Sequence, residues 1–197
     1  MKTIRSNKRS GFTLVEMIGV LAVIAVLAAL LVPRVFAAIN ESRINNAVSG
    51  VNSLKAAAMQ YFGKYGCFGD ANGGQISATT NDWDQVLLKT GMLERPFETR
   101  LGATTNTIRL VTGGTVSAAV SPTSDSFDLS GSGSVDTSSA KAVVIAVIQG
   151  IAADDAAQID QRIDGKTMSY PVDTTYSKGR VKWDGATETL KVYIAHK

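Results

Sequence analysis

The chain has 197 residues, of which 45% are hydrophobic and 19% charged, a composition that excludes a wholly disordered polymer. The formal net charge is +3, but the first eleven residues contribute +4 and the remainder therefore sums to −1. Because the basic residues cluster only there, we predict no nucleic-acid partner. A role in DNA uptake stays open, since composition does not reveal a local patch.

The N-terminal segment, residues 1–36, joins a basic leader to a long apolar run. Four cations, Lys2, Arg5, Lys8 and Arg9, precede the run, and Glu16 lies inside it. Met17–Pro33 carries no charge and, as a helix, would measure roughly 25 Å, close to the hydrocarbon thickness of a bilayer. The positive-inside rule predicts a single pass through the cytoplasmic membrane, with the N-terminus in the cytoplasm and the rest of the chain outside.

The string Gly11-Phe12-Thr13-Leu14-Val15-Glu16 resembles the start of type IV prepilins and the related pseudopilins. The resemblance covers about residues 1–65. It implies that a prepilin peptidase and methyltransferase removes the leader, 1–11, by cutting between Gly11 and Phe12, and then N-methylates Phe12. It also implies that Glu16 acts in assembly at the inner membrane, and that the helix kinks or melts at Pro33.

Elementary chemistry supports these roles independently of the resemblance. A glycine lets a peptidase approach the backbone closely, and cleavage frees an amine at Phe12. The Glu16 carboxylate, set in an apolar segment, favours a cation, which the amine of a neighbouring copy can supply. The alternative is that Glu16 is an interfacial acid stabilised by the dipole at the helix start.

Two other interpretations of the N-terminal segment compete with a pilus subunit. In the first, it is an ordinary secretory signal cut after Val35-Phe36-Ala37, which would release a binding domain that starts at Ala38. The apolar run is longer than the usual 7–15 residues and contains Glu16, which disfavours this interpretation. In the second, the chain is a pseudopilin of a type II secretion system, and the N-terminal segment does not distinguish the two.

Beyond the membrane segment, apolar residues continue at helical spacing and polar residues occupy the other faces. The repeating apolar positions are Ile44, Val48, Val51, Ala58, Phe62 and Tyr65. We predict one helix over 12–65, with its membrane span at about 12–36 and its end at Gly66. Two helices hinged at Pro33 are the alternative. Residues 66–197 form a globular head.

In the first half of the head, the sequence pattern predicts short elements separated by polar loops. Cys67–Asn81 is glycine- and asparagine-rich and is assigned to a loop, and Asp82–Thr90 to a helix that ends at Gly91. Thr107–Val111 and Thr115–Val120 predict a β-hairpin. Thr112–Ser139 is rich in Ser, Thr and Gly and is expected to be a polar connector, with a short strand at Phe127–Leu129.

The second half begins with the apolar run Lys141–Ile151, for which helix and buried strand compete. Helix is preferred because a helical pattern, Asp154–Ile163, follows it. Gly179–Trp183 and Thr189–His196 predict strands joined by a turn at Asp184-Gly185. The expected fold class is therefore α+β: a long N-terminal helix packed against a small antiparallel sheet, with one or two extra helices.

The sequence offers little for catalysis or metal binding. Cys67 is the single cysteine and His196 the single histidine, so no intrachain disulfide can form and no Cys/His metal cluster occurs. We expect no enzymatic activity, no cofactor and no metal. Calcium is the alternative, at Asp70 or among Asp125, Asp128 and Asp136, although the ligand set of an EF-hand loop is incomplete.

These observations predict a structural subunit that rests in membrane lipid and then assembles with copies of itself. The expected product is a type IV pilus-like filament, extracellular or periplasmic, extracted from the membrane by the inner-membrane assembly machinery. Small residues on the apolar helix allow close helix approach in such a filament. They are Gly19, Ala22, Ala25, Ala28 and Ala29.

Overall fold

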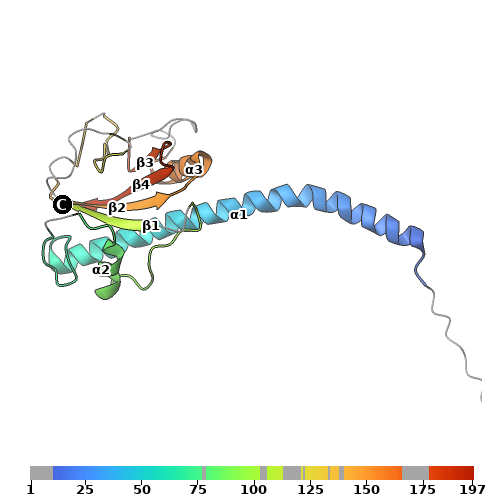
Figure 1. Ribbon diagram of the computed structural model, residues 1–197, viewed down its shortest axis with the longest axis horizontal. Coiled ribbons are helices and arrows are strands. Elements are labelled where there is room, and N and C mark those ends of the chain that lie inside the picture. Colours follow the sequence, from blue (N-terminus) through green and yellow to red (C-terminus); the bar gives the residue numbers. More distant parts are fainter. Residues whose placement is uncertain are drawn as a thin grey trace, which may run out of the picture. The chain divides into compact units, whose positions relative to one another are not determined.

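The computed structural model describes residues 11–76, 79–102, 106–112, 121, 123–132, 134–137, 140–165 and 178–197. Two compact units divide the chain, Met1–Glu41 and Ser42–Lys197. The first contains the start of helix α1. The second, called the head from here on, joins residues 42–65 of α1 to the predicted head, 66–197, and holds a four-stranded sheet and two further helices (Figure 1). This is the α+β fold that the sequence predicts.

Helix α1 spans Leu14–Tyr65 and starts two residues later than predicted. Its helical assignment continues through Pro33, so the structure shows one helix and no interruption at the proline. The helix ends where predicted, because Gly66 adopts a positive φ of 71° and its N–H donates to the carbonyl of Phe62. Glycine takes this left-handed conformation without a Cβ penalty.

The head contains an antiparallel sheet with the strand order β1-β2-β4-β3. The strands are β1 (Asn106–Thr112), β2 (Ala142–Gln149), β3 (Val181–Asp184) and β4 (Thr189–His196). Strand β2 is central: it pairs with β1 from Asn106↔Ile148 to Thr112↔Ala142, and with β4 on its other side. The register between β2 and β4 shifts at Val144/Ile145.

One face of this sheet packs on the C-terminal half of α1. The buried residues of α1 recur at helical spacing, and Ile44, Leu54 and Tyr61 are among them. They share a core with Leu110 of β1 and Ile148 of β2. The apolar stripe that the sequence predicted after residue 43 is therefore the surface on which the sheet rests.

The prediction of a helix over Lys141–Ile151 is wrong, because Ala142–Gln149 forms the central strand β2. Every residue from Ala142 to Ile148 is buried, so both faces of the strand are covered. A strand buried on both sides has no polar alternation, and its composition then resembles that of a buried helix. The β-branched residues Val143, Val144, Ile145, Val147 and Ile148 favour the strand.

The two short helices and the final turn agree with the predictions. Helix α2 spans Trp83–Lys89 and α3 spans Ala153–Ile163. Strands β3 and β4 follow within two residues of the predicted bounds. Four residues, 185–188, connect them, and the Asp184 carboxylate accepts hydrogen bonds from the Ala186 N–H and the Thr187 hydroxyl.

The other face of the sheet is covered by residues from the predicted polar connector. Phe127 is fully buried against a cluster that includes Val143, Ile145 and Val147 of β2. The Phe127 N–H donates to the buried hydroxyl of Thr137, which fixes the cover internally. The strand predicted at Phe127–Leu129 is absent, and an isolated β-bridge between Asp128 and Lys178 is the strand-like pairing found there. The second strand of the predicted hairpin, Thr115–Val120, lies outside the described residues.

Backbone groups at both outer strands of the sheet have partners. Beside β1, Thr80 and Leu110 exchange two backbone hydrogen bonds of 2.9 and 2.8 Å. Beside β3, the Asp164 carboxylate at the end of α3 accepts the N–H groups of Arg180 and Val181. Asp164 also forms an ion pair with the Arg180 guanidinium at 2.9 Å.

Candidate functional site: the start of helix α1

The first turn of α1 is closed by a reciprocal contact between Thr13 and Glu16. The Thr13 N–H and hydroxyl both donate to Glu16 Oε2 at 2.8 Å, and the Glu16 N–H donates back to Thr13 Oγ1 at 3.3 Å. This is a capping box, in which the side chains of the N-cap and N3 residues satisfy backbone donors that a helix start leaves unpaired. Glu16 therefore has a partner in its own chain before any assembly.

Thr13 was not among the predicted site residues, although its role follows from a sequence pattern. Thr13 and Glu16 are three residues apart, immediately before an apolar run, and this spacing is the signature of a capping box. The same contact explains why the helix begins at Leu14 and not at Phe12. It also favours the alternative considered above, that Glu16 stabilises the helix start, without excluding a second role in assembly.

Nothing in the part of the chain that the structure describes requires glycine at position 11. A Cβ placed on it meets no atom within 4 Å, and its φ is not among the positive values. Residues with an open environment and an ordinary backbone accept alanine or larger side chains without strain. A requirement for glycine at this position must therefore come from outside the folded chain, as expected for a peptidase site.

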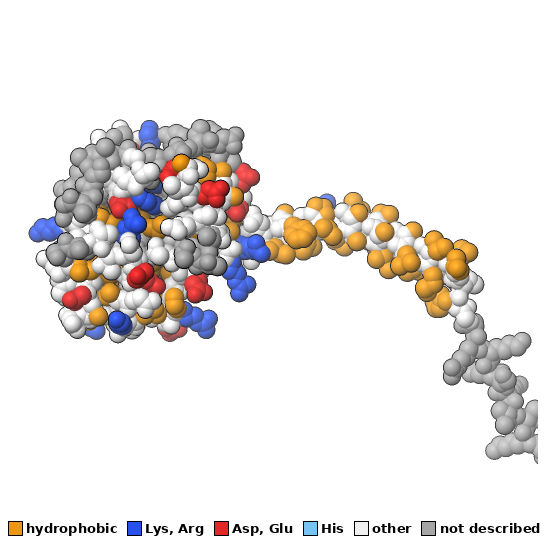
Figure 2. All heavy atoms as spheres, viewed as in Figure 1, with side chains coloured by type: hydrophobic (Ala, Val, Ile, Leu, Met, Phe, Trp, Pro, Cys, Tyr) orange, Lys and Arg blue, Asp and Glu red, His pale blue; other side chains and the backbone are white. Residues whose placement is uncertain are grey.

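The large apolar side chains of the N-terminal unit are exposed along α1, and Figure 2 shows in orange those on the face in view. Phe12 is 76% exposed and Leu21 is 64% exposed. Among the described residues, α1 is the one helix long and apolar enough to cross a membrane by length and composition. Large exposed apolar surface is unfavourable in water, so this unit requires lipid or protein around it.

Small residues interrupt this surface and leave room for a close neighbour. A Cβ on Gly19 would meet no atom within 4 Å. Ala22, Val23, Val26 and Leu27 line a shallow apolar hollow on the helix. Helices in membranes approach one another most closely where small residues lie at the contact, so this surface suits packing against another helix.

Residues 6–32 match the family model described as Prokaryotic N-terminal methylation motif. This segment is the prepilin-type cleavage and methylation signal. The match includes Gly11, Phe12 and Glu16, and ends one residue before Pro33. Comparison with curated proteins and with solved structures gave no significant match.

A prepilin-type signal followed by an apolar helix supports a type IV pilin-like or pseudopilin protein, and the signal implies processing by prepilin peptidase. The same two features fit a membrane-anchored chain. The roles of Gly11 in cleavage, Phe12 in methylation and Glu16 in assembly, and a kink at Pro33, remain predictions.

The acidic residues that were weighed as calcium ligands are used within the chain. Asp70 Oδ1 accepts the N–H groups of Asn72 and Gly74, each at 2.8 Å. Asp136 accepts the N–H of Ser130, and this hydrogen bond lowers the pKa of Asp136. Among the described residues, no three His, Cys, Asp or Glu side chains are grouped closely enough to hold a metal ion.

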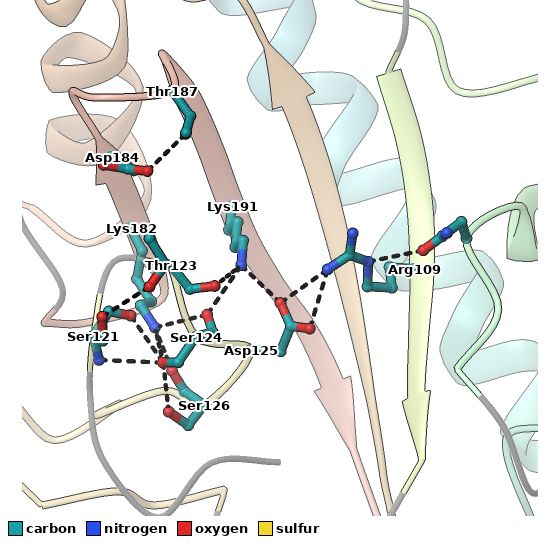
Figure 3. Close-up of polar contacts among 11 residues, drawn as sticks. Arg109, Ser121, Thr123, Ser124, Asp125, Ser126, Lys182, Asp184, Thr187 and Lys191 are labelled. Atoms are coloured by element: carbon teal, nitrogen blue, oxygen red, sulfur yellow. Dashed lines mark hydrogen bonds and ion pairs between the residues drawn. The ribbon is translucent and has the colours of Figure 1, made fainter. Parts of the chain in front are cut away.

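A cluster of cations on the outer face of the sheet is the main polar feature that the sequence did not predict (Figure 3). Lys191 donates to Asp125 at 2.8 Å, and Arg109 forms an ion pair with the same carboxylate at 3.1 Å. Lys182 is fully buried and donates to the carbonyls of Ser124 and Ser126 and to the Ser124 hydroxyl. Together these cations hold the segment 123–126 on the sheet.

Among the described residues, no carboxylate is hydrogen-bonded to Lys182, and its ammonium lies 4.9 Å from the centre of the Phe127 ring. Burial, together with the charge of Lys191, its partner on β4, lowers the pKa of Lys182 to about 7, against the opposing effect of Asp125. The cluster therefore links the segment 123–126 to the sheet, and the protonation state of one of its cations, Lys182, depends on pH.

His196, at the end of β4, is exposed and has a close neighbour on the same strand. The Tyr193 hydroxyl lies 2.6 Å from His196 Nδ1. Residues three apart on one strand point to opposite faces in regular geometry, so their contact depends on the end of β4 departing from that geometry. Nothing in this pair supplies a nucleophile with an orienting third group.

Proposed function

We propose that this protein is the structural subunit of a type IV pilus-like filament. After insertion into the cytoplasmic membrane, prepilin peptidase removes residues 1–11, and Phe12 is N-methylated. The subunit then leaves the membrane through the inner-membrane assembly machinery and packs against copies of itself. The filament lies outside the cytoplasmic membrane, and the role of the protein is mechanical, not catalytic.

The observation that carries this proposal is the combination of a prepilin-type signal with an exposed apolar helix at residues 14–39. Lipid covers this helix before assembly, and the helices of neighbouring subunits cover it afterwards. Because lipid and protein interiors are similarly apolar, moving from one to the other depends on packing and on charge, not on the hydrophobic effect. The small residues between Gly19 and Ala29 allow close packing against neighbouring helices. The core of the head is unchanged by assembly.

Charge directs the assembly step in this proposal. Cleavage leaves a cationic amine at Phe12, close to Glu16, and both enter a water-poor environment when helices pack together. A buried charge is strongly unfavourable unless it is paired, so Glu16 would exchange its contacts with Thr13 for the amine of a neighbouring subunit. That exchange fixes the axial position of each new subunit.

The test is to express the full chain with a prepilin peptidase and an assembly system, and to characterise the product. Mass spectrometry should find methylated Phe12 as the first residue, and electron microscopy should find fibres that contain the protein. A mature chain that starts at Ala38 would show ordinary secretion and contradict the proposal. Short fibres confined to the periplasm and dependent on a secretion system would identify a pseudopilin.

A further inference from the structure

The mature part of the N-terminal unit, residues 12–41, carries four charges. They are the Phe12 amine, Glu16, Arg34 and Glu41, and along the chain their signs alternate: positive, negative, positive, negative. Glu16 and the amine already have a role in the proposed function. Arg34 does not: it is exposed, and no described residue forms an ion pair with it.

The helical geometry places all four charges on one side of α1. At 3.6 residues per turn, and taking Phe12 as zero, Glu16 and Arg34 lie at about 40° and Glu41 lies at about 20° around the helix axis. Phe12 precedes the first helical residue, Leu14, by two positions, so its angle is approximate. We call this line of four groups the charged seam. In a helical fibre, a seam that faces the fibre axis is shared by every copy, so groups of different copies meet there.

The axial spacings show which groups can meet. Phe12 and Glu16 are about 6 Å apart along the axis and Arg34 and Glu41 about 10.5 Å, with the cation nearer the N-terminus in both pairs. Displacing one copy outward by about 6–10 Å therefore brings its amine level with Glu16 of its neighbour, and its Arg34 close to the neighbour's Glu41. The remaining mismatch of about 4.5 Å is within the length of an arginine side chain.

Other displacements pair fewer of the charges. A displacement of about 27 Å would bring Arg34 level with Glu16 of a neighbour, but would leave the amine and Glu41 without a counter-charge. Because burying an unpaired charge is costly, the displacement that pairs all four is favoured. Glu41 already makes an interaction within its own chain, and a carboxylate has room for a further hydrogen bond.

We propose that Arg34 of one subunit and Glu41 of a second copy form an intersubunit ion pair that sets the same axial displacement as the pair between the Phe12 amine and Glu16. The partner is thus another copy of this chain, recognised through the charged seam. This inference rests on the proposed function, because it requires subunits that pack through α1.

Charge reversal tests the pair directly. Arg34→Glu and Glu41→Arg should each lower the yield of fibres at least about tenfold, since each places like charges opposite one another. The exchanged variant, Arg34→Glu with Glu41→Arg, should recover most of the yield. Lys89→Glu is the matched control, because it makes the same charge change on an exposed residue of α2 and should assemble normally. Leader cleavage should be unaffected in all four variants.

A second measurement does not depend on rescue. In a Cys67→Ser background, Arg34→Cys with Glu41→Cys should give a ladder of covalent multimers when fibres are treated with a bis-maleimide crosslinker of about 10 Å span, roughly the distance that an arginine–glutamate pair bridges between two packed helices. Each single-cysteine variant can give dimers at most. Val35→Cys with Glu41→Cys, which rotates one thiol by about 100° around the helix, should give little ladder.

The possible results separate this inference from the proposed function. Normal assembly of both single reversals, or an exchanged variant that stays as defective as the singles, would overturn the Arg34–Glu41 pair. Fibres of the double-cysteine variant without a ladder would do the same. In each of these cases the parent chain still forms fibres and the proposed function stands. A parent chain that is processed but never forms fibres would overturn both.

Discussion

Leucine has two opposite environments on the same helix. Leu21 in the N-terminal unit is 64% exposed, whereas Leu54 in the head is 1% exposed. The two positions differ in their neighbours along the sequence. Around Leu21 every side of the helix is apolar, whereas around Leu54 every side but one is polar. A helix that is apolar all round has no face reserved for its own domain, so its partners must come from elsewhere. The head, in contrast, completes its core with its own sheet.

The largest expected effect concerns the processing of the N-terminal unit. Gly11→Val should block leader cleavage, because a branched Cβ obstructs the approach of a peptidase to the backbone. The head should fold normally, since Gly11 contacts nothing that a Cβ would disturb. Immunoblotting of membrane fractions should show the longer chain only. Efficient shortening of this variant would disprove the assigned cleavage position.

The next prediction concerns Glu16 and its contact with Thr13. Glu16→Ala should leave membrane insertion and leader cleavage intact but sharply reduce fibre formation, because the incoming amine would lack a counter-charge. Thr13→Val should weaken the helix start through loss of the cap and have a smaller effect on assembly. Electron microscopy and cleavage assays distinguish the two. Abundant fibres made from Glu16→Ala alone would show that Glu16 acts only as a capping residue.

Truncating an apolar side chain should destabilise the head only when that side chain lies in the core of the head. Ile148→Ala removes a fully buried side chain from β2 and should destabilise the head by about 2–5 kcal/mol, which corresponds to roughly 2–4 °C in Tm for each kcal/mol. Ile24→Ala is the matched control, since Ile24 is 54% exposed, and it should leave the head's Tm unchanged. Thermal unfolding of the detergent-solubilised chain measures both. Equal losses would mean that the two units unfold together.

Lys182 should make the stability of the head depend on pH. The pKa of Lys182 is about 7 in the folded chain and near its ordinary value of 10.5 when unfolded, so between these values the unfolded chain binds more protons. Stability should therefore rise with pH from about 7, by at most about 1.4 kcal/mol per pH unit, and be independent of this group below that range. Burial raises the pKa of Tyr61 to about 12, which opposes the trend above pH 10.

Denaturant unfolding between pH 7 and 9.5 tests this dependence. Lys182→Met should flatten the slope, whereas Lys89→Met, at an exposed position, should leave it as in the parent chain. Identical slopes in the parent and Lys182→Met would mean that Lys182 remains charged in the folded state.

The smallest expected effect is that of calcium. Thermal melts of the head with added calcium and with a chelator should coincide, because Asp70, Asp125 and Asp136 are already held by backbone N–H groups or cations. A rise of several degrees with calcium would reveal a site of substantial affinity and contradict this expectation.

The parts of the fold that could be predicted depend on local sequence. The leader, the apolar run and the stop at Gly66 each follow from residues that are adjacent in the chain. Strand β2 was assigned wrongly because its burial depends on β1 and β4, which are distant in sequence. The capping box is also a local signal, because Thr13 lies three residues before Glu16. The resemblance implied an assembly role for Glu16 and said nothing of Thr13.

The cation cluster could not have been predicted from the sequence. Lys182 contacts residues 56 and 58 positions away, and Lys191 contacts residues 66 to 68 positions away. Lysines that alternate with apolar residues on β3 and β4 normally indicate a solvent-facing side of a sheet. They are buried here because the segment around Phe127 covers that side, and nothing in its Ser- and Thr-rich composition indicates a cover.

The partners at the outer strands of the sheet limit how heads can associate. Thr80 occupies backbone groups of β1, and the Asp164 carboxylate occupies the N–H groups that lead into β3. Where backbone donors and acceptors at a sheet edge are taken, another chain cannot extend the sheet by strand addition, which is the usual route to amyloid-like aggregation. In the proposed fibre, the contacts at Leu110, Arg180 and Val181 would hinder strand addition between neighbouring heads at these positions, and the order of the fibre would be left to the helices.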